Sequence, residues 1–178
     1  MSESVELIPM LCVKCQTSLS AQPDEVAWAC PACGQGQLLM EDKGLVAMQF
    51  YYDSRLQPGQ PGKPYWVAQG QAQLSRSTYS GNQSAEMLAY WSQPRLFFIP
   101  AFSLPLEQLI AVGSALLRQP PAITQGSPAA FQPVTLHPDD LRPMAEFILI
   151  SLEAERRDML KELNFNLTLS APALWILP

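Results

Sequence analysis

The clearest pattern of hydrophobic and polar positions lies in residues 65–74, where the two classes alternate. Apolar or small residues occupy every second position, and Gln69, Gln71 and Gln73 stand between them. A period of two is typical of a strand with one buried face, because successive side chains of a strand point to opposite sides. The segment predicts a half-buried antiparallel strand with an apolar face made by Trp66, Ala68, Gly70, Ala72 and Leu74.

Two other segments have clear hydrophobic patterns. Arg95–Ile99 is a short apolar run between two prolines, which favours a buried strand. In residues 106–117 apolar side chains recur every three or four positions, which predicts a helix with one wide apolar face, capped by Ser103. The stretch 76–93 is polar with scattered aromatic residues and is interpreted as a long excursion. Shorter strands are expected at 25–30, 37–40 and 45–52.

An internal similarity bears on Met144–Ala154, whose own pattern is ambiguous between strand and helix. Pro94–Pro100 matches Pro172–Pro178 position by position, with both prolines and a leucine identical. One interpretation is a duplicated strand unit, in which Met144–Ala154 would correspond to the glutamine-rich strand and would itself be a strand. The other is coincidence in a chain with 17 prolines.

Composition places the chain among globular proteins. It has 178 residues, of which 48% are hydrophobic and only 15% charged, so a substantial core can form. The patterns together predict an α+β fold with two parts. An N-terminal unit is expected over residues 1–43, and a mainly antiparallel β domain with at least one buried helix over residues 44–178.

All four cysteines lie in the first 33 residues, as Cys12-Val-Lys-Cys15 and Cys30-Pro-Ala-Cys33. A CxxC turn directs two thiolates at one point, and two such turns on facing hairpins form a tetrahedral four-cysteine metal site. Two disulfides are the alternative for an even number of cysteines, but the paired spacing favours metal. Gly34 follows the second pair, where such turns often need a positive φ, whereas Gln16 holds the equivalent place in the first.

This two-knuckle pattern resembles the zinc ribbon family over about residues 8–42. The resemblance implies one structural Zn²⁺ per chain, bound by Cys12, Cys15, Cys30 and Cys33. The second knuckle, CPAC followed by glycine, also resembles the iron-binding knuckle of rubredoxin-like domains, which implies Fe(Cys)₄ electron transfer. Zinc is favoured because the rest of the chain, with one histidine, lacks the Glu and His pairs of a di-iron partner site.

Little in the rest of the chain points to catalysis. His137 is the single histidine, and in His137-Pro-Asp-Asp140 a loop with a capping aspartate is a simpler interpretation than an acid–base pair. The sequence contains no Gly-rich phosphate loop and no GxSxG turn. The charges between Glu153 and Lys161 are expected to form a solvated surface. Four thiolates would also leave no open position on the metal, so the chain is not expected to be an enzyme.

Neither a membrane span nor a signal peptide is expected. Residues 96–117 are the most apolar stretch, but Pro100 and Pro105 interrupt it and Glu107 would lie inside the bilayer. Residues 1–6 contain two acidic side chains and no basic one, unlike a signal peptide. The sequence therefore predicts a cytoplasmic protein.

The leading functional hypothesis is a non-catalytic, zinc-stabilised interaction or assembly subunit of a complex. The alternative is a nucleic-acid-associated factor of the transcription type, but the net charge of −5 and the scarcity of lysine near the cysteines make nucleic acid an unlikely partner. The row of Gln69, Gln71 and Gln73, with Tyr65 and Val67 on the same face, is the predicted contact with a protein partner or a second copy. Amides both donate and accept hydrogen bonds, which suits such a contact.

Overall fold

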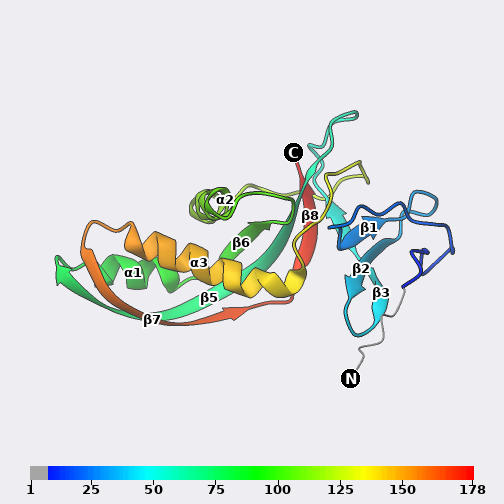
Figure 1. Cartoon of the computed structure of the whole chain (residues 1–178). Helices are drawn as coiled ribbons and strands as arrows, with labels where there is room; N and C mark the ends of the chain where they lie inside the picture. The colour runs from blue at the N-terminus through cyan, green and yellow to red at the C-terminus, as the bar shows by residue number, and fades with distance from the viewer. Residues whose placement is uncertain (1–7) are drawn as a thin grey trace, which may run out of the picture.

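The computed structural model describes residues 8–178 and contains two β-sheets. Figure 1 shows the smaller sheet beside one end of the larger, elongated one. The beginning of the predicted unit 1–43, including the acidic segment that argued against a signal peptide, lies outside the described residues.

The smaller sheet has three short antiparallel strands, which lie close to the cysteines. They are β1 (Ala27–Ala29), β2 (Gly36–Met40) and β3 (Gly44–Met48). β2 lies in the centre, where Leu38 pairs with Ala27 on one side and Val46 on the other. The predicted strand 45–52 is in fact two strands, because the chain leaves β3 and enters the larger sheet after Gln49.

The larger sheet is organised around β5, a strand of 18 residues. β6 pairs with the first part of β5 on one edge, while β8 and then β7 follow one another along the opposite edge. β4 joins β8 as its parallel neighbour, so the sheet is mixed but mostly antiparallel. Beyond β6, β5 and β7 continue as a long, curved two-stranded ribbon (Figure 1). The strands are β4 (Phe50–Tyr52), β5 (Lys63–Ser80), β6 (Arg95–Pro100), β7 (Met159–Leu169) and β8 (Ala173–Leu177).

Within residues 8–178, three α-helices and one 3₁₀-helix complete the fold, which confirms the predicted α+β class. They are α1 (Ser84–Trp91), α2 (Leu106–Arg118), η1 (Pro138–Asp140) and α3 (Leu141–Ala154). α1 and α3 lie on the same side of the β5–β7 ribbon (Figure 1). α2 packs closely on α3 at Gly113, where a Cβ atom would collide with the side chain of Ile148. Within residues 8–178, no helix is both long and apolar enough to cross a membrane.

The smaller sheet and the larger one share a hydrophobic core. Ala27 and Leu38 belong to the same buried cluster as Trp66 and Phe97 of the larger sheet. The Val26 N–H donates to the carbonyl of Val134 at 2.8 Å, which joins β1 to the long connection before α3. The cysteine-bearing part is therefore packed onto the rest of the chain.

His137 makes a second link between the two parts. Its Nε2 lies 3.1 Å from the carbonyl oxygen of Leu39, and its Nδ1 lies 3.3 Å from the backbone nitrogen of Asp139. The histidine lies in a loop, as expected, but it is His137 itself that caps η1. The expected aspartate cap is wrong for α3, where Asp140 makes no side-chain cap hydrogen bond.

The polar stretch 76–93, interpreted from the sequence as a long excursion, consists largely of regular structure. It contains the end of β5 and all of α1. Alternation continues along β5, because Ser75 and Ser77 stay exposed while the side chain of Arg76 turns inward. A pattern search misses this because the inward residue is charged rather than apolar.

The two faces of the glutamine-rich strand are only partly as predicted. Gln69, Gln71 and Gln73 are exposed. Tyr65 and Val67, however, are only 7% and 6% exposed, because residues of α2 and the preceding loop cover that end of the strand. The expectation that these two side chains share an accessible face with the glutamines is wrong.

Met144–Ala154 is helical, so the duplicated unit that required a strand there is wrong on this point. A helical row, Leu141, Ala145, Ile148 and Leu152, is buried on the face that packs toward the sheet. Arg95–Ile99 and Leu174–Leu177 are nevertheless both buried strands, as predicted, and they flank β5 on opposite edges. The prolines that flank both segments therefore correspond to similar positions in one sheet, since both strands pair with the first part of β5.

The charges near Glu153 are not all on a solvated surface. The side chains of Arg76, Glu153 and Asp158 are at most 1% exposed and form a buried ion cluster. Arg76 Nη2 donates to Asp158 Oδ1 at 2.7 Å, and the Trp91 ring N–H donates to Glu153 Oε1 at 2.9 Å. The cluster joins β5, α1 and α3 to the chain entering β7, since Asp158 also accepts the Gln83 N–H.

Acid should weaken this cluster through Asp158. Burial opposes ionisation, but the Gln83 N–H and Arg76 outweigh it and hold the pKa of Asp158 below its ordinary value. The carboxylate therefore contributes stability above its unfolded-state pKa of about 3.9, and this contribution is lost as the pH falls through the lower folded-state value. Asp158→Asn should lower the melting temperature most near pH 6, and the gap to the wild type should narrow below about pH 4.

The exposed Asp24 provides the control, because Asp24→Asn should change the melting temperature little at any pH. A gap for Asp158→Asn that stays constant from pH 6 to pH 3 would contradict the role given to its charge.

Candidate metal centre

The two CxxC turns are built in the same way, although their sequences differ. The N–H of the first cysteine donates to the carbonyl five residues later, from Cys12 to Thr17 and from Cys30 to Gln35, both at 2.9 Å. The residue after each second cysteine donates back to the first, from Gln16 to Cys12 and from Gly34 to Cys30, again at 2.9 Å. Each turn is therefore a closed loop of backbone hydrogen bonds that fixes two sulfur atoms on one side.

Both turns end in a left-handed residue, as the sequence suggested for the second. Gly34 has a φ of 72° and Gln16 a φ of 59°. A left-handed conformation is unfavourable for a residue with a Cβ, and Gln16 gains a compensating hydrogen bond from its Nε2 to the Cys12 carbonyl at 3.2 Å. The first turn thus keeps the same geometry with glutamine in place of glycine.

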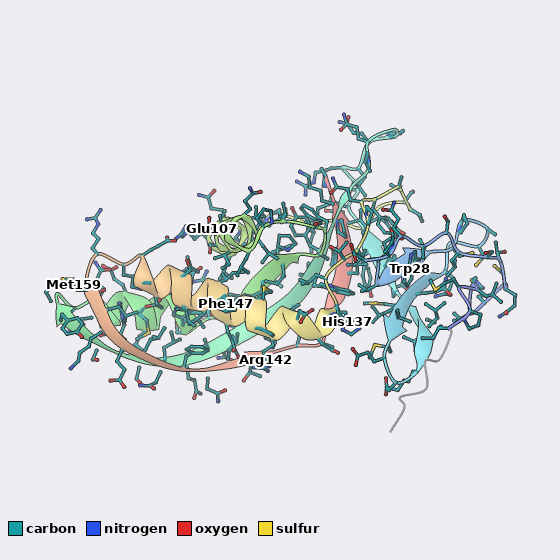
Figure 2. The ribbon with its side chains drawn as sticks, viewed as in Figure 1. Trp28, Glu107, His137, Arg142, Phe147 and Met159 are labelled. Carbon is teal, nitrogen blue, oxygen red and sulfur yellow. The ribbon has the colours of Figure 1, made fainter. Side chains whose placement is uncertain are left out.

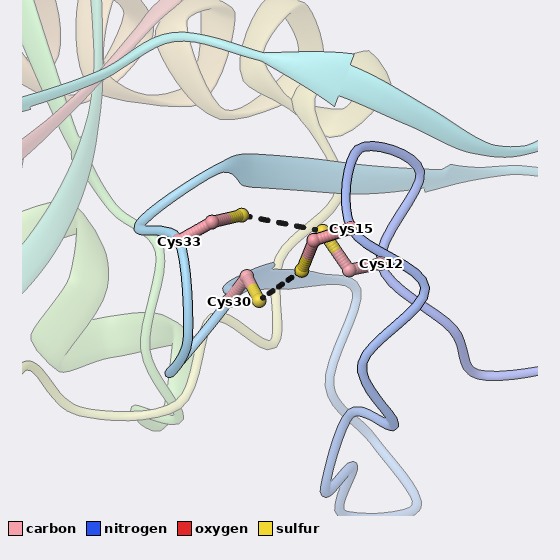
Figure 3. Close-up of side chains that lie close together, drawn as sticks. All are labelled: Cys12, Cys15, Cys30 and Cys33. Atoms are coloured by element: carbon pink, nitrogen blue, oxygen red, sulfur yellow. Dashed lines mark hydrogen bonds between the residues drawn. The ribbon is translucent and has the colours of Figure 1, made fainter.

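The four sulfur atoms converge between the two turns (Figure 3). Cys12 Sγ lies 3.6 Å from Cys33 Sγ, and Cys15 Sγ lies 3.5 Å from Cys30 Sγ. All four lie within 4.8 Å of one another. A tetrahedral ion with bonds of about 2.3 Å to sulfur needs S···S distances of about 3.8 Å, so the arrangement fits one metal ion.

The electrostatics of the thiols also suit a cation. The hydroxyl and the N–H of Thr17 lower the pKa of Cys15 to about 6. The Gln35 N–H favours ionisation of Cys33, but burial and the other three thiols outweigh it and raise the pKa of Cys33 to about 12. Four adjacent thiols cannot all ionise without compensation, and a bound cation supplies it.

The cysteines lie in a small apolar cluster of their own. Cys12, Cys30 and Leu19 are buried in a cluster that includes only Met10, Cys33 and Leu45 besides. Cys15 is exposed at the edge. This cluster is small, so a metal ion bound by the four cysteines would add to the stability of the unit. Trp28 is buried and its ring N–H donates to Glu25 Oε2 at 2.8 Å, so it is part of the packing, as expected.

Sequence reasoning missed the residues that support the cysteines. Thr17 acts on the Cys15 sulfur, and Gln37 of β2 accepts the Val13 N–H inside the first turn at 2.7 Å. Spacing identifies the ligands themselves, but no short motif identifies these supporting contacts.

Comparison with known proteins adds nothing to this picture. No protein-family model, no curated protein and no solved structure matched the chain significantly. The structure therefore defines a four-cysteine cluster beside a small antiparallel sheet, with room for one metal ion.

Removing one thiolate should abolish metal binding. Cys30→Ser is expected to reduce the metal content from one ion per chain to none, measured by elemental analysis of protein purified without chelator. Because Ala27 and Leu38 share a core with the larger sheet, the melting temperature of the whole chain should also fall. Ala32→Ser places the same new side chain at an exposed position of the same turn and should keep the metal. Retention of one ion by Cys30→Ser would contradict the four-cysteine site.

The left-handed turn gives a second, independent check. No atom lies within 4 Å of a Cβ built on Gly34, so Gly34→Ala tests the backbone conformation alone. The metal-loaded protein should lose about 1 kcal/mol of unfolding free energy in a denaturant titration. An unchanged unfolding midpoint would show that the positive φ is not required.

Proposed function

We propose that this protein is a non-catalytic, zinc-stabilised interaction or assembly subunit of a cytoplasmic complex. The observation that carries the proposal is the outer face of the β5–β7 ribbon. Much of that face is exposed yet carries polar side chains without charge. The helices α1 and α3 lie on the other side of the ribbon (Figure 2).

The part of the outer face nearer β6 is an array of uncharged polar side chains. The paired strands place each β5 residue opposite a β7 residue on the same face. Seven exposed members toward the β6 end carry no charge: Gln69, Gln71, Gln73 and Ser75 of β5, with Asn164, Asn166 and Thr168 of β7. We call this set the neutral ribbon face. Farther along the ribbon, Ser77 pairs with the exposed Glu162 on the same face.

This chemistry suits a wet protein contact better than a surface meant for solvent alone. Exposed surfaces of soluble proteins usually carry many charged side chains, which favour solvent over association. Amide and hydroxyl groups instead offer donors and acceptors that a partner can satisfy directly or through water, with little charge to desolvate. The predicted contact is therefore retained without Tyr65 and Val67, and Asn164, Asn166 and Thr168 join it.

Zinc is the metal that the donor set supports. Four thiolates form the closed tetrahedral set of structural zinc sites, and the paired CxxC turns resemble the zinc ribbon. A closed site leaves no position for a catalytic water, so the metal's role is to fold the unit. When bound, zinc would be held by Cys12, Cys15, Cys30 and Cys33.

The charges of the cysteine-bearing part give little support to nucleic-acid binding. Lys43 lies 3.7 Å from the carboxylate of Asp42, which offsets its charge, and Glu41 is exposed beside them. A phosphate backbone needs an uncompensated basic surface.

A charge placed on the neutral ribbon face should weaken association. The partner is first identified by affinity capture with the wild-type chain and then purified, or the chain is tested for self-association by sedimentation. Gln71→Lys should then weaken the contact at least tenfold, about 1.4 kcal/mol, because the contact must desolvate the new charge. Its melting temperature should stay near that of the wild type.

Gln57→Lys is the matched control, since it makes the same substitution at an exposed loop position away from the ribbon. It should leave the affinity unchanged. Equal affinity of the Gln71→Lys variant and the wild type for a confirmed partner would remove the neutral ribbon face from the contact.

A further inference from the structure

The first cysteine turn is attached to the rest of the molecule by very few polar contacts. Within the described part of the chain, residues 8–20 make only one hydrogen bond to later residues besides the sulfur contacts. This bond runs from the Val13 N–H to Gln37 Oε1 at 2.7 Å. Gln37 lies in the central strand β2 and is completely buried.

The second cysteine turn explains why the first needs this bond. The two turns match in their backbone hydrogen bonds and in their left-handed final residue. At the place of Val13 the second turn has Pro31, which has no N–H to satisfy. The first turn has an N–H there, and the amide of Gln37 accepts it.

Burying this glutamine has a cost. Gln37 Nε2 has no hydrogen-bond partner within the described residues, although the side chain is inaccessible to solvent. An unpaired buried amide is unfavourable, and an apolar side chain of the same length would avoid the penalty. Filling the core therefore does not explain a glutamine here, whereas its bond to Val13 does.

We infer that Gln37 is a positioning residue for metal binding, which holds the first turn so that Cys12 and Cys15 meet Cys30 and Cys33. It contacts no sulfur and does not bind the metal itself. It fixes the turn to β2, which is joined to the second knuckle through the short segment Gly34–Gly36. The inference rests on metal binding by the four cysteines and not on the proposed protein contact.

The test is a double-mutant cycle on the zinc-loaded full chain. Gln37→Met removes the acceptor and keeps the length of the side chain. Val13→Pro removes the donor and gives the first turn the residue found in the second. The rate of zinc transfer to a chromogenic chelator is measured for both single variants and for the double variant, with Gln49→Met as the control at an exposed glutamine.

Each single variant should release zinc about 10- to 100-fold faster, as is typical when a group that orients a metal ligand is lost. The double variant should be no faster than the faster single variant, because both changes remove the same bond. The thiolate-to-metal absorption of the Co²⁺-substituted variants should stay that of four sulfur ligands. Gln49→Met should release zinc at the wild-type rate.

A merely structural role for Gln37 predicts a different outcome. Gln37→Met would then leave the release rate within twofold of the wild type, since methionine fills the same space without an unpaired amide. That result, or rate effects of the two single variants that multiply in the double variant, would overturn the inference. Failure of the wild-type chain to bind zinc would instead reject the metal proposal itself.

Discussion

The convergence of four cysteine sulfurs is the constraint on which the N-terminal part of this structure depends. Two turns separated by fourteen residues must bring four thiols within 4.8 Å of one another. Around them the chain buries only a small apolar cluster, too little to hold two hairpins together. A cation bound by the thiolates would supply further stabilisation, and the folding of the two turns would then be coupled to metal binding.

The consequences of this constraint reach beyond the cysteines. β1 and β2, which follow the two turns, contribute Ala27 and Leu38 to the core of the larger sheet. The bond from Val26 to Val134 and the His137 ring add direct links. The cysteine-bearing part thus completes the core of the domain that carries the neutral ribbon face, although it lies at the other end of the molecule (Figure 1).

The features that could be predicted from the sequence are those set by short-range patterns of apolar residues or by cysteine spacing. The alternation around Trp66, the helix over 106–117 and the spacing of the cysteines each depend on neighbouring residues, and each corresponds to a feature of the structure. The failures have long-range causes. Arg76 continues β5 because its charge meets Glu153 and Asp158, which are about 80 positions away in sequence.

The same reason explains the other misses. Tyr65 and Val67 are buried by α2, which no pattern within their own strand could indicate. The apolar run of Met144–Ala154 is compatible with a strand or a helix. The segment is helical because its apolar face packs against the sheet and α2. Gln37 escaped notice because a buried glutamine has no sequence signature, and only the position of Val13 reveals its role.

The most direct test of the central claim is X-ray absorption at the metal edge of the purified full chain. One zinc per chain surrounded by four sulfur atoms at about 2.3 Å is the predicted result. A first shell that contains nitrogen or oxygen, an iron edge in place of zinc, or the absence of stoichiometric metal would contradict a zinc-stabilised fold.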